Sequence, residues 1–177
     1  VLKNKMIIKF AYWFESFIYK RAKLINVLTP AFRDKLINYK KVPKEKVIFI
    51  PNAADFSLAK KIQEDDNFDS IEFKYNLGLA NKFVITYVGA HGVANHLIQL
   101  IDAAEKLKDT NVVFQLIGAG MQKEILVEEV NKRKLKNVIF RNPVPKEEVF
   151  KYILASDVGA SVLKRVDTFK TIYSNKT

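Results

Sequence analysis

The stretch KFVITYVGAHGVANHLIQL, residues 82–100, decides the fold class of this 177-residue chain. Its first part, from Lys82 to Val88, is a continuous apolar run of the kind that forms a buried parallel strand. An apolar face at helical spacing follows, at Leu97, Leu100, Ile101, Ala104 and Leu107. Two glycines and a histidine lie between these two segments. The pattern predicts a buried strand, a glycine-containing turn and a helix.

The same alternation continues toward the carboxyl end of the chain. Three strands and two helices are predicted in the order strand, helix, strand, helix, strand, at 111–117, 121–134, 137–140, 146–155 and 157–163. Such alternation is typical of a parallel sheet covered on both faces, so the predicted fold class is α/β with a Rossmann-like parallel sheet and flanking helices. Ligands of these sheets bind at the carboxyl ends of the strands. A common site is therefore expected where the loops begin, at Gly89, Gly118, Asn142 and Lys164.

The amino-terminal part of the chain has a different pattern. An amphipathic helix is predicted from Ile7 to Lys23, with apolar residues at helical spacing that include Phe10, Phe14, Phe17 and Ile18. Charged residues interrupt this segment well before the ~18 apolar residues of a membrane span, so neither an anchor nor a signal peptide is predicted. Thr29 and Pro30 form a typical helix start for a second helix, which is expected to run to about Tyr39. Short strands are expected at 24–28 and 46–50.

Residues 59–81 separate the two patterns. The segment KKIQEDDNFDS is charged and polar and shows no clear strand period, which is typical of a connection. The predicted organisation is a first domain at 1–58, a linker at 59–81 with one short helix near 71–77, and a second domain at 82–177.

The composition limits the chemistry of any site. Thirty Lys and Arg against 19 Asp and Glu give a formal net charge of +11. This charge predicts attraction to an anionic partner, such as nucleic acid, a phosphorylated substrate or an acidic membrane surface, with a solvated basic surface as the alternative. The absence of cysteine excludes disulfides, thiolate metal sites and thiol nucleophiles, and two histidines leave few ligands for a metal.

A nucleic-acid-binding α/β module is the alternative function of a different class. The basic run at Lys132–Lys136 would support it. The aromatic residues, however, lie in apolar strand and helix patterns instead of alternating with arginine, and no helix-turn-helix, RNP or zinc spacing is present. Nucleic acid is therefore not an expected partner.

The first glycine loop, Gly89 to Gly92, is a candidate phosphate site. A loop that follows a buried strand and leads into a helix offers free backbone N–H groups and the positive end of the helix dipole. Gly89 and Gly92 would let a ligand approach the backbone, and His91 could donate a hydrogen bond to an anion. A glycine turn that only redirects the chain is the alternative. His96 is interpreted as a solvated side chain.

The second glycine pair, Gly118 and Gly120, resembles part of a dinucleotide-binding fingerprint. The third glycine is missing and Lys123 stands in its place. Arg141 lies where a ribose-binding acid would be needed, about 20 residues further on. The pair therefore favours a tight strand-to-helix turn over a nicotinamide or flavin site.

An ordered set of motifs then carries a resemblance to a known family. The motifs are PNAADF (51–56), YVGAHGVANHL (87–97), LIGAGMQKEIL (116–126), NVIFRNPVPKEEVFKYILASDVGASVL (137–163) and FKTIYSNKT (169–177). In this order they resemble group 1 glycosyltransferases, family 4, of the GT-B fold. Within that family the chain is most similar to the bacterial branch that builds capsular and O-antigen polysaccharides, including N-acetylfucosamine transferases.

The resemblance implies two Rossmann-like domains that face a cleft, with the nucleotide-sugar donor held by the carboxyl-terminal domain. The chain would then contain the end of the acceptor domain, at 1–58, and the first part of the donor domain, at 82–177. Residues implied at the donor diphosphate are Gly89, His91, Gly92, Asn95, Lys170 and Thr171. Residues implied near the nucleotide are Gly118, Gly120, Asn142, Val144, Ser174 and Lys176.

Two departures from the family pattern affect the mechanism. Many relatives place an Arg and a Lys after the first strand of the donor domain, where this chain has Ala-His-Gly, so Lys170 is the candidate for the missing charge. Thr171 stands at the place of the first of two family glutamates, and the second would lie beyond Thr177. No catalytic residue is assigned, and the chain alone is not expected to turn over.

The resemblance also implies an activity and its partners. The parent enzyme would be a retaining, metal-independent hexosyltransferase without a cofactor, and it would use a UDP-sugar or another nucleotide-sugar as donor. Its acceptor would be a polysaccharide or a polyprenyl-linked saccharide. A cytoplasmic location is expected, with peripheral contact to the anionic inner face of the membrane and self-association through the helix at Ile7–Lys23. A non-catalytic Rossmann-like nucleotide-binding domain is the remaining alternative.

Overall fold

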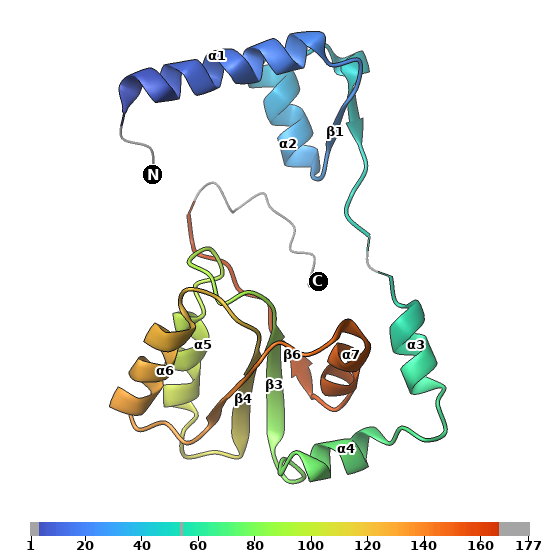
Figure 1. The fold of residues 1–177 in the computed structure, drawn as a ribbon, viewed down its shortest axis with the longest axis vertical. Coiled ribbons are helices and arrows are strands. Elements are labelled where there is room, and N and C mark those ends of the chain that lie inside the picture. Colours follow the sequence, from blue (N-terminus) through green and yellow to red (C-terminus); the bar gives the residue numbers. More distant parts are fainter. Residues whose placement is uncertain (1–3, 54, 167–177) are drawn as a thin grey trace. The chain divides into compact units, whose positions relative to one another are not determined.

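A computed structural model describes residues 4–53 and 55–166 of the chain (Figure 1). These residues form two compact units, which meet in sequence near residue 54. Within the described ranges, no helix combines the length and the apolar character needed to cross a bilayer.

The first unit is built on a two-stranded parallel sheet. Its elements are α1 (Lys5–Arg21), β1 (Ile25–Val27), α2 (Pro30–Asp34), the π-helical turn η1 (Lys35–Tyr39), the 3-10 turn η2 (Lys44–Lys46) and β2 (Val47–Phe49). Strand β1 pairs with β2 in the register Ile25 to Val47. The predicted helix start is confirmed, because the Thr29 hydroxyl accepts a hydrogen bond from the Phe32 N–H at 3.1 Å and Pro30 occupies the first turn.

The core of this unit is small. Val27, Leu36, Val42 and Val47 are buried together. Helix α1 has no buried residue of its own and touches this core through Tyr19, which is partly buried. A row of aromatic rings runs along α1 and stays exposed; it consists of Phe10, Trp13, Phe14 and Phe17.

The second unit is an α/β layer structure. Its helices are α3 (Ser57–Gln63), α4 (Ser70–Asn76), α5 (Ile98–Lys106), α6 (Lys123–Lys132) and α7 (Lys146–Leu154). Its strands are β3 (Phe83–Val88), β4 (Val112–Ile117), β5 (Val138–Arg141) and β6 (Val158–Gly159). The strands form one sheet in the order β5-β4-β3-β6, and every pair is parallel. The predicted fold class is therefore confirmed.

The sheet has a different apolar layer on each face, since successive side chains of a strand point to opposite sides. Tyr87 and Leu116 pack against helices α5 and α6, where Ile101 and Ala104 are fully buried. Val84 and Val113 pack on the other face with Leu79. Figure 1 shows α5 and α6 on one side of the strands and α7 on the other.

Two parts of the second unit differ from the prediction. Residues 59–81 were expected to be a linker with one helix, but they include most of α3 as well as α4, and both helices contact α7. Helix α3 is hard to predict because it is short and only Ile62 is buried on it. The last strand was expected at 157–163 and covers only Val158–Gly159, because it pairs with β3 at Ile85 and Thr86 alone.

Asp157 joins three elements of the second unit. One of its carboxylate oxygens accepts hydrogen bonds from Lys74 Nζ of α4 and from the Val84 N–H of β3, each at 2.7 Å. The Lys74 ammonium, and then the Val84 N–H, hold the pKa of the Asp157 carboxyl below its ordinary value of 3.8. The charged carboxylate therefore stabilises the fold.

We predict that Asp157→Asn removes a pH-dependent part of the stability. Because the folded pKa of Asp157 lies below the unfolded value, its contribution is complete above about pH 4 and is lost as the pH falls through the folded pKa. The substitution should lower the free energy of unfolding by about 1–2 kcal/mol at pH 7 and by much less near pH 2. Urea unfolding at the two pH values measures this, and an equal loss at both would contradict it.

Candidate functional site

The loops that follow β3, β4 and β5 begin side by side at one edge of the sheet. The register pairs Val88 with Ile117, and Ile117 with Arg141, so the three strands end at the same level. Gly89, Gly118 and Asn142 come directly after these residues. The expectation that the loops meet at the carboxyl edge therefore holds for these three strands.

Backbone hydrogen bonds join the two glycine loops to each other. The Gly89 N–H donates to Ile117 O at 3.0 Å, and the His91 N–H donates to Ala119 O at 2.8 Å. The Gln122 N–H donates in return to His91 O at 3.0 Å. Each loop thus forms hydrogen bonds with main-chain groups of the other, which fixes the two loops relative to each other.

This loop contact explains both glycines of the second pair. Gly118 and Gly120 have φ values of +148° and +154°, which L side chains rarely adopt. A Cβ on Gly118 would collide with the carbonyl oxygen of Gly89, and a Cβ on Gly120 would lie 2.6 Å from the carbonyl oxygen of His91. The geometry requires both glycines even without a ligand, in agreement with their interpretation as a tight turn.

His91 does not lie where the sequence suggested. Its imidazole was expected to face a diphosphate, but the side chain is fully buried, with its ring centroid 6.1 Å from the rings of both Tyr87 and Phe140. Neither ring nitrogen has a hydrogen-bond partner among the described residues. Burial, and then the nearby Lys123 charge, lower the pKa of His91, which keeps the ring neutral at pH 7. The paired backbone of His91 turns its side chain inward, so the ring is not presented to a ligand.

Main-chain donors of the first glycine loop remain available. In the described part of the chain, no hydrogen bond uses the N–H groups of Gly92 and Val93. Asn95, which was implied at the diphosphate, shapes the loop, because its amide nitrogen donates to Ala90 O at 2.7 Å. The Tyr87 hydroxyl donates to the same oxygen at 2.9 Å. These two contacts fix the position of the Ala90 carbonyl, two residues before Gly92.

Lys123 supplies a positive charge at the same edge. Its ammonium donates to Gly118 O at 3.1 Å, to Arg141 O at 3.2 Å and to Asn142 Oδ1 at 2.9 Å. All three acceptors are neutral, and no described carboxylate pairs with it. In the sequence, Lys123 stands out only as a substitute for the third glycine of a dinucleotide-binding fingerprint. Its position three residues after Gly120, at the start of a helix, was the signal that it reaches this edge.

The other predicted site residues are only partly placed. Asn142 and Val144 lie in the loop between β5 and α7, and Asn142 is bound to Lys123. The segment after β6 also reaches the first glycine loop, since the Lys164 N–H donates to Ala94 O at 2.8 Å. Four predicted residues lie outside the described residues; they are Lys170, Thr171, Ser174 and Lys176. No group of three His, Asp or Glu residues that could hold a metal occurs in residues 4–53 and 55–166.

Comparisons with known proteins match the chain to glycosyltransferases. No family model matches it. Over 116 residues, 66% of the chain, it is 29% identical to the putative colanic acid biosynthesis glycosyl transferase WcaI of Escherichia coli, and it spans 28% of that protein.

Solved structures give the fold. Anabaena HepE in complex with UDP-glucose aligns with a TM-score of 0.68 at 21% identity, over 82% of this chain and 40% of HepE. WaaG, a glycosyltransferase involved in lipopolysaccharide biosynthesis, aligns with a TM-score of 0.62 at 17% identity, over 78% of this chain and 37% of WaaG. The chain therefore has the fold of part of a GT-B glycosyltransferase and spans well under half the length of these proteins.

We predict that Gly120→Ala lowers the free energy of unfolding by about 1–3 kcal/mol, because it combines a disfavoured φ with a backbone collision. Gly92→Ala is the matched control. A Cβ on Gly92 would meet only Asn95 Nδ2, at 3.7 Å, so this variant should lose no stability beyond about 0.5 kcal/mol. Thermal or urea unfolding of both variants gives the comparison. Equal losses would show that the loop contact does not require Gly120.

Proposed function

We propose that this chain is part of a GT-B glycosyltransferase that takes a sugar from a UDP-sugar and transfers it to a polysaccharide or a lipid-linked saccharide of the bacterial surface. One observation carries the proposal. The N–H groups of Gly92 and Val93, which make no hydrogen bond among the described residues, and the Lys123 ammonium group belong to loops that begin at the same edge of the sheet. The UDP-glucose complex of HepE and the polysaccharide-related name of WcaI support the choice of substrates.

The physical requirement of the reaction is to stabilise the leaving group. As the bond to the sugar breaks, the nucleoside diphosphate gains negative charge, and fixed N–H donors and cations lower the energy of that state. Gly92 and Val93 would supply the donors, and Lys123 would supply charge without a metal ion. Lys123 would also hold the loops at Gly118 and Asn142 in place for the nucleotide. In this proposal His91 fixes the loop through its backbone instead of contacting the donor.

Retention of configuration belongs to the same proposal. The family resemblance implies it, and the sequence offers no nucleophilic carboxylate for a covalent intermediate, so a same-face substitution is the proposed route. The anomeric configuration of the product, read by NMR from a full-length relative of this branch, would test it. Transfer of N-acetylfucosamine is the finer proposal within the same branch.

The basic surface offers less to nucleic acid than its sequence suggested. Arg133, the one arginine of the run at Lys132–Lys136, donates to Asp102, Glu105 and Glu129 at 2.7–2.9 Å. An arginine held by three carboxylates is poorly placed to bind a phosphate. This argues against the nucleic-acid-binding alternative.

A cytoplasmic location of the protein remains a proposal. Peripheral membrane contact and self-association are proposals that concern helix α1. Its exposed rings and its lysines suit an anionic leaflet. The same rings would equally suit apolar packing against another protein surface.

We predict that UDP binds this chain at the glycine loops. In an NMR titration, the amide signals of 89–95 and 118–123 should shift saturably with UDP and less with GDP. Lys123→Gln should weaken binding about tenfold, because it removes one charge-assisted contribution to the diphosphate site. Lys132→Gln, on the same helix and with the same change of charge, is the control and should bind UDP like the unsubstituted chain.

Either of two results would contradict the proposed donor site. One is saturable shifts confined to other regions of the chain. The other is an equal loss of affinity in the Lys123 and Lys132 variants, which would indicate diffuse attraction to a basic surface.

A further inference from the structure

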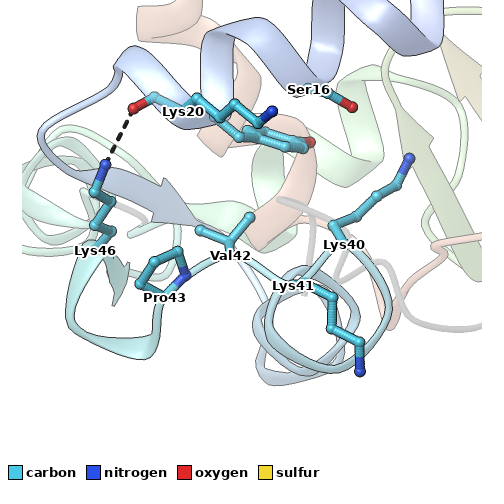
Figure 2. Close-up of a pocket in the computed structure, with 8 residues that line it drawn as sticks. Ser16, Lys20, Lys40, Lys41, Val42, Pro43 and Lys46 are labelled. Carbon is cyan, nitrogen blue, oxygen red and sulfur yellow. Dashed lines mark hydrogen bonds between the residues drawn. The ribbon is translucent and has the colours of Figure 1, made fainter.

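A recess in the first unit has no part in the proposed donor site. It lies between the carboxyl-terminal half of α1 and the segment 40–46, and has a volume of about 340 Å³ (Figure 2). Tyr19, Val42 and Pro43 give it an apolar wall, and Ser16 and four lysines line the rest. Four of its eight lining residues are lysines, so positive charge dominates the recess.

Three of these lysines lie around the recess. In Figure 2 the side chains of Lys20, Lys40 and Lys46 lie around Val42, while the ammonium group of Lys41 points away from them. Lys46 Nζ donates to Lys20 O at 3.2 Å, which ties the segment before β2 to the end of α1. Lys40 Nζ lies 2.5 Å from Glu15 Oε2 and 4.9 Å from the centre of the Tyr12 ring. Lys40 and Lys46 are thus held in place by the fold.

The positive charge of the recess is not balanced by the protein. Glu15 is the one carboxylate in contact with its described lysines, and it already accepts from Lys40 and from the Tyr19 hydroxyl, the latter at 2.9 Å. Lys20, Lys41 and Lys46 take part in no ion pair within the described ranges. Clustered like charges repel, and a bound anion relieves that repulsion.

Capping of α1 explains only part of this cluster. Basic residues near the carboxyl end of a helix interact favourably with its dipole, which accounts for Lys20 and for the bond from Lys46. Lys40 lies on a different segment and is held by Glu15 instead, and the ammonium group of Lys41 points away from the recess (Figure 2).

We propose that this recess binds a phosphate or diphosphate group. Lysine ammonium groups bind phosphate as point charges, and the apolar wall suits the organic part of a phosphate ester. The recess lies where α1 leads into β1 and where the segment 40–46 leads into β2, which is the amino end of both parallel strands. Ligands of parallel sheets usually bind at the carboxyl ends of the strands, so the proposed phosphate site would be separate from a site of that kind. It does not depend on the proposed donor site.

The same chemistry could come from a soluble phosphate ester or from a lipid headgroup. Pyrophosphate is the soluble probe. In an NMR titration of the full chain, amide signals of 19–21 and 40–46 should shift saturably. The double variant Lys20→Gln/Lys46→Gln should weaken this binding about tenfold, because two charge-assisted contacts are lost.

The control is Lys5→Gln/Lys9→Gln, which makes the same change of charge on exposed positions of the same helix. It should leave the pyrophosphate affinity of the recess unchanged. Lys20→Arg/Lys46→Arg keeps the charge and should retain binding, which separates loss of charge from loss of fold. Thermal melting of each variant reports whether the unit is intact.

Binding to lipid vesicles distinguishes a lipid headgroup from a soluble phosphate ester. If the natural ligand is a lipid headgroup, the chain should bind phosphatidylcholine vesicles that contain phosphatidylglycerol, and pyrophosphate or the Lys20/Lys46 glutamine variant should reduce that binding. Binding of pyrophosphate that vesicles do not compete for supports a soluble ester. The proposal is overturned if residues 40–46 show no saturable shift, or if the Lys5/Lys9 variant loses as much affinity as the Lys20/Lys46 variant.

Discussion

The contact between the two glycine loops of the second unit determines the rest of the candidate site. Reciprocal backbone bonds link His91 to Ala119 and Gln122, and they bring the loops so close that a Cβ at Gly120 has no space. Buried main-chain groups must be paired, and here each loop pairs those of the other. The need for the two glycines and the inward turn of His91 both follow from this contact.

The site that results relies on main-chain groups and one cation. An interior histidine that finds no hydrogen-bond partner in the described part of the chain is costly, and the neutral state of the ring between Tyr87 and Phe140 limits that cost. The positive charge comes instead from Lys123, which joins the ends of β4 and β5 through neutral oxygens. A charge held in this way is fixed in position before any ligand arrives, as the proposed diphosphate site requires.

The two units carry positive charge in different ways. In the second unit, Arg133 is neutralised by three carboxylates and the Lys123 charge is concentrated at the carboxyl edge of the sheet. In the first unit, lysines gather at the amino ends of β1 and β2 around a recess. The net charge of +11 is therefore not a uniform basic surface. Its distribution leads to two separate hypotheses, a donor site near Lys123 and a phosphate site in the recess of the first unit. The composition alone does not distinguish them.

The sequence by itself determined the parallel α/β sheet of the second unit, the glycine loops at its carboxyl edge and the cap of α2, because these depend on local periodicity and turn chemistry. The tertiary structure alone decided where the side chains of His91 and Lys123 point, and it placed lysines distant in sequence around one recess. Helix α3 also escaped prediction, since one buried residue, Ile62, gives no periodic signal. The physical reason is that such features depend on contacts between segments far apart in the chain, which a local pattern does not contain.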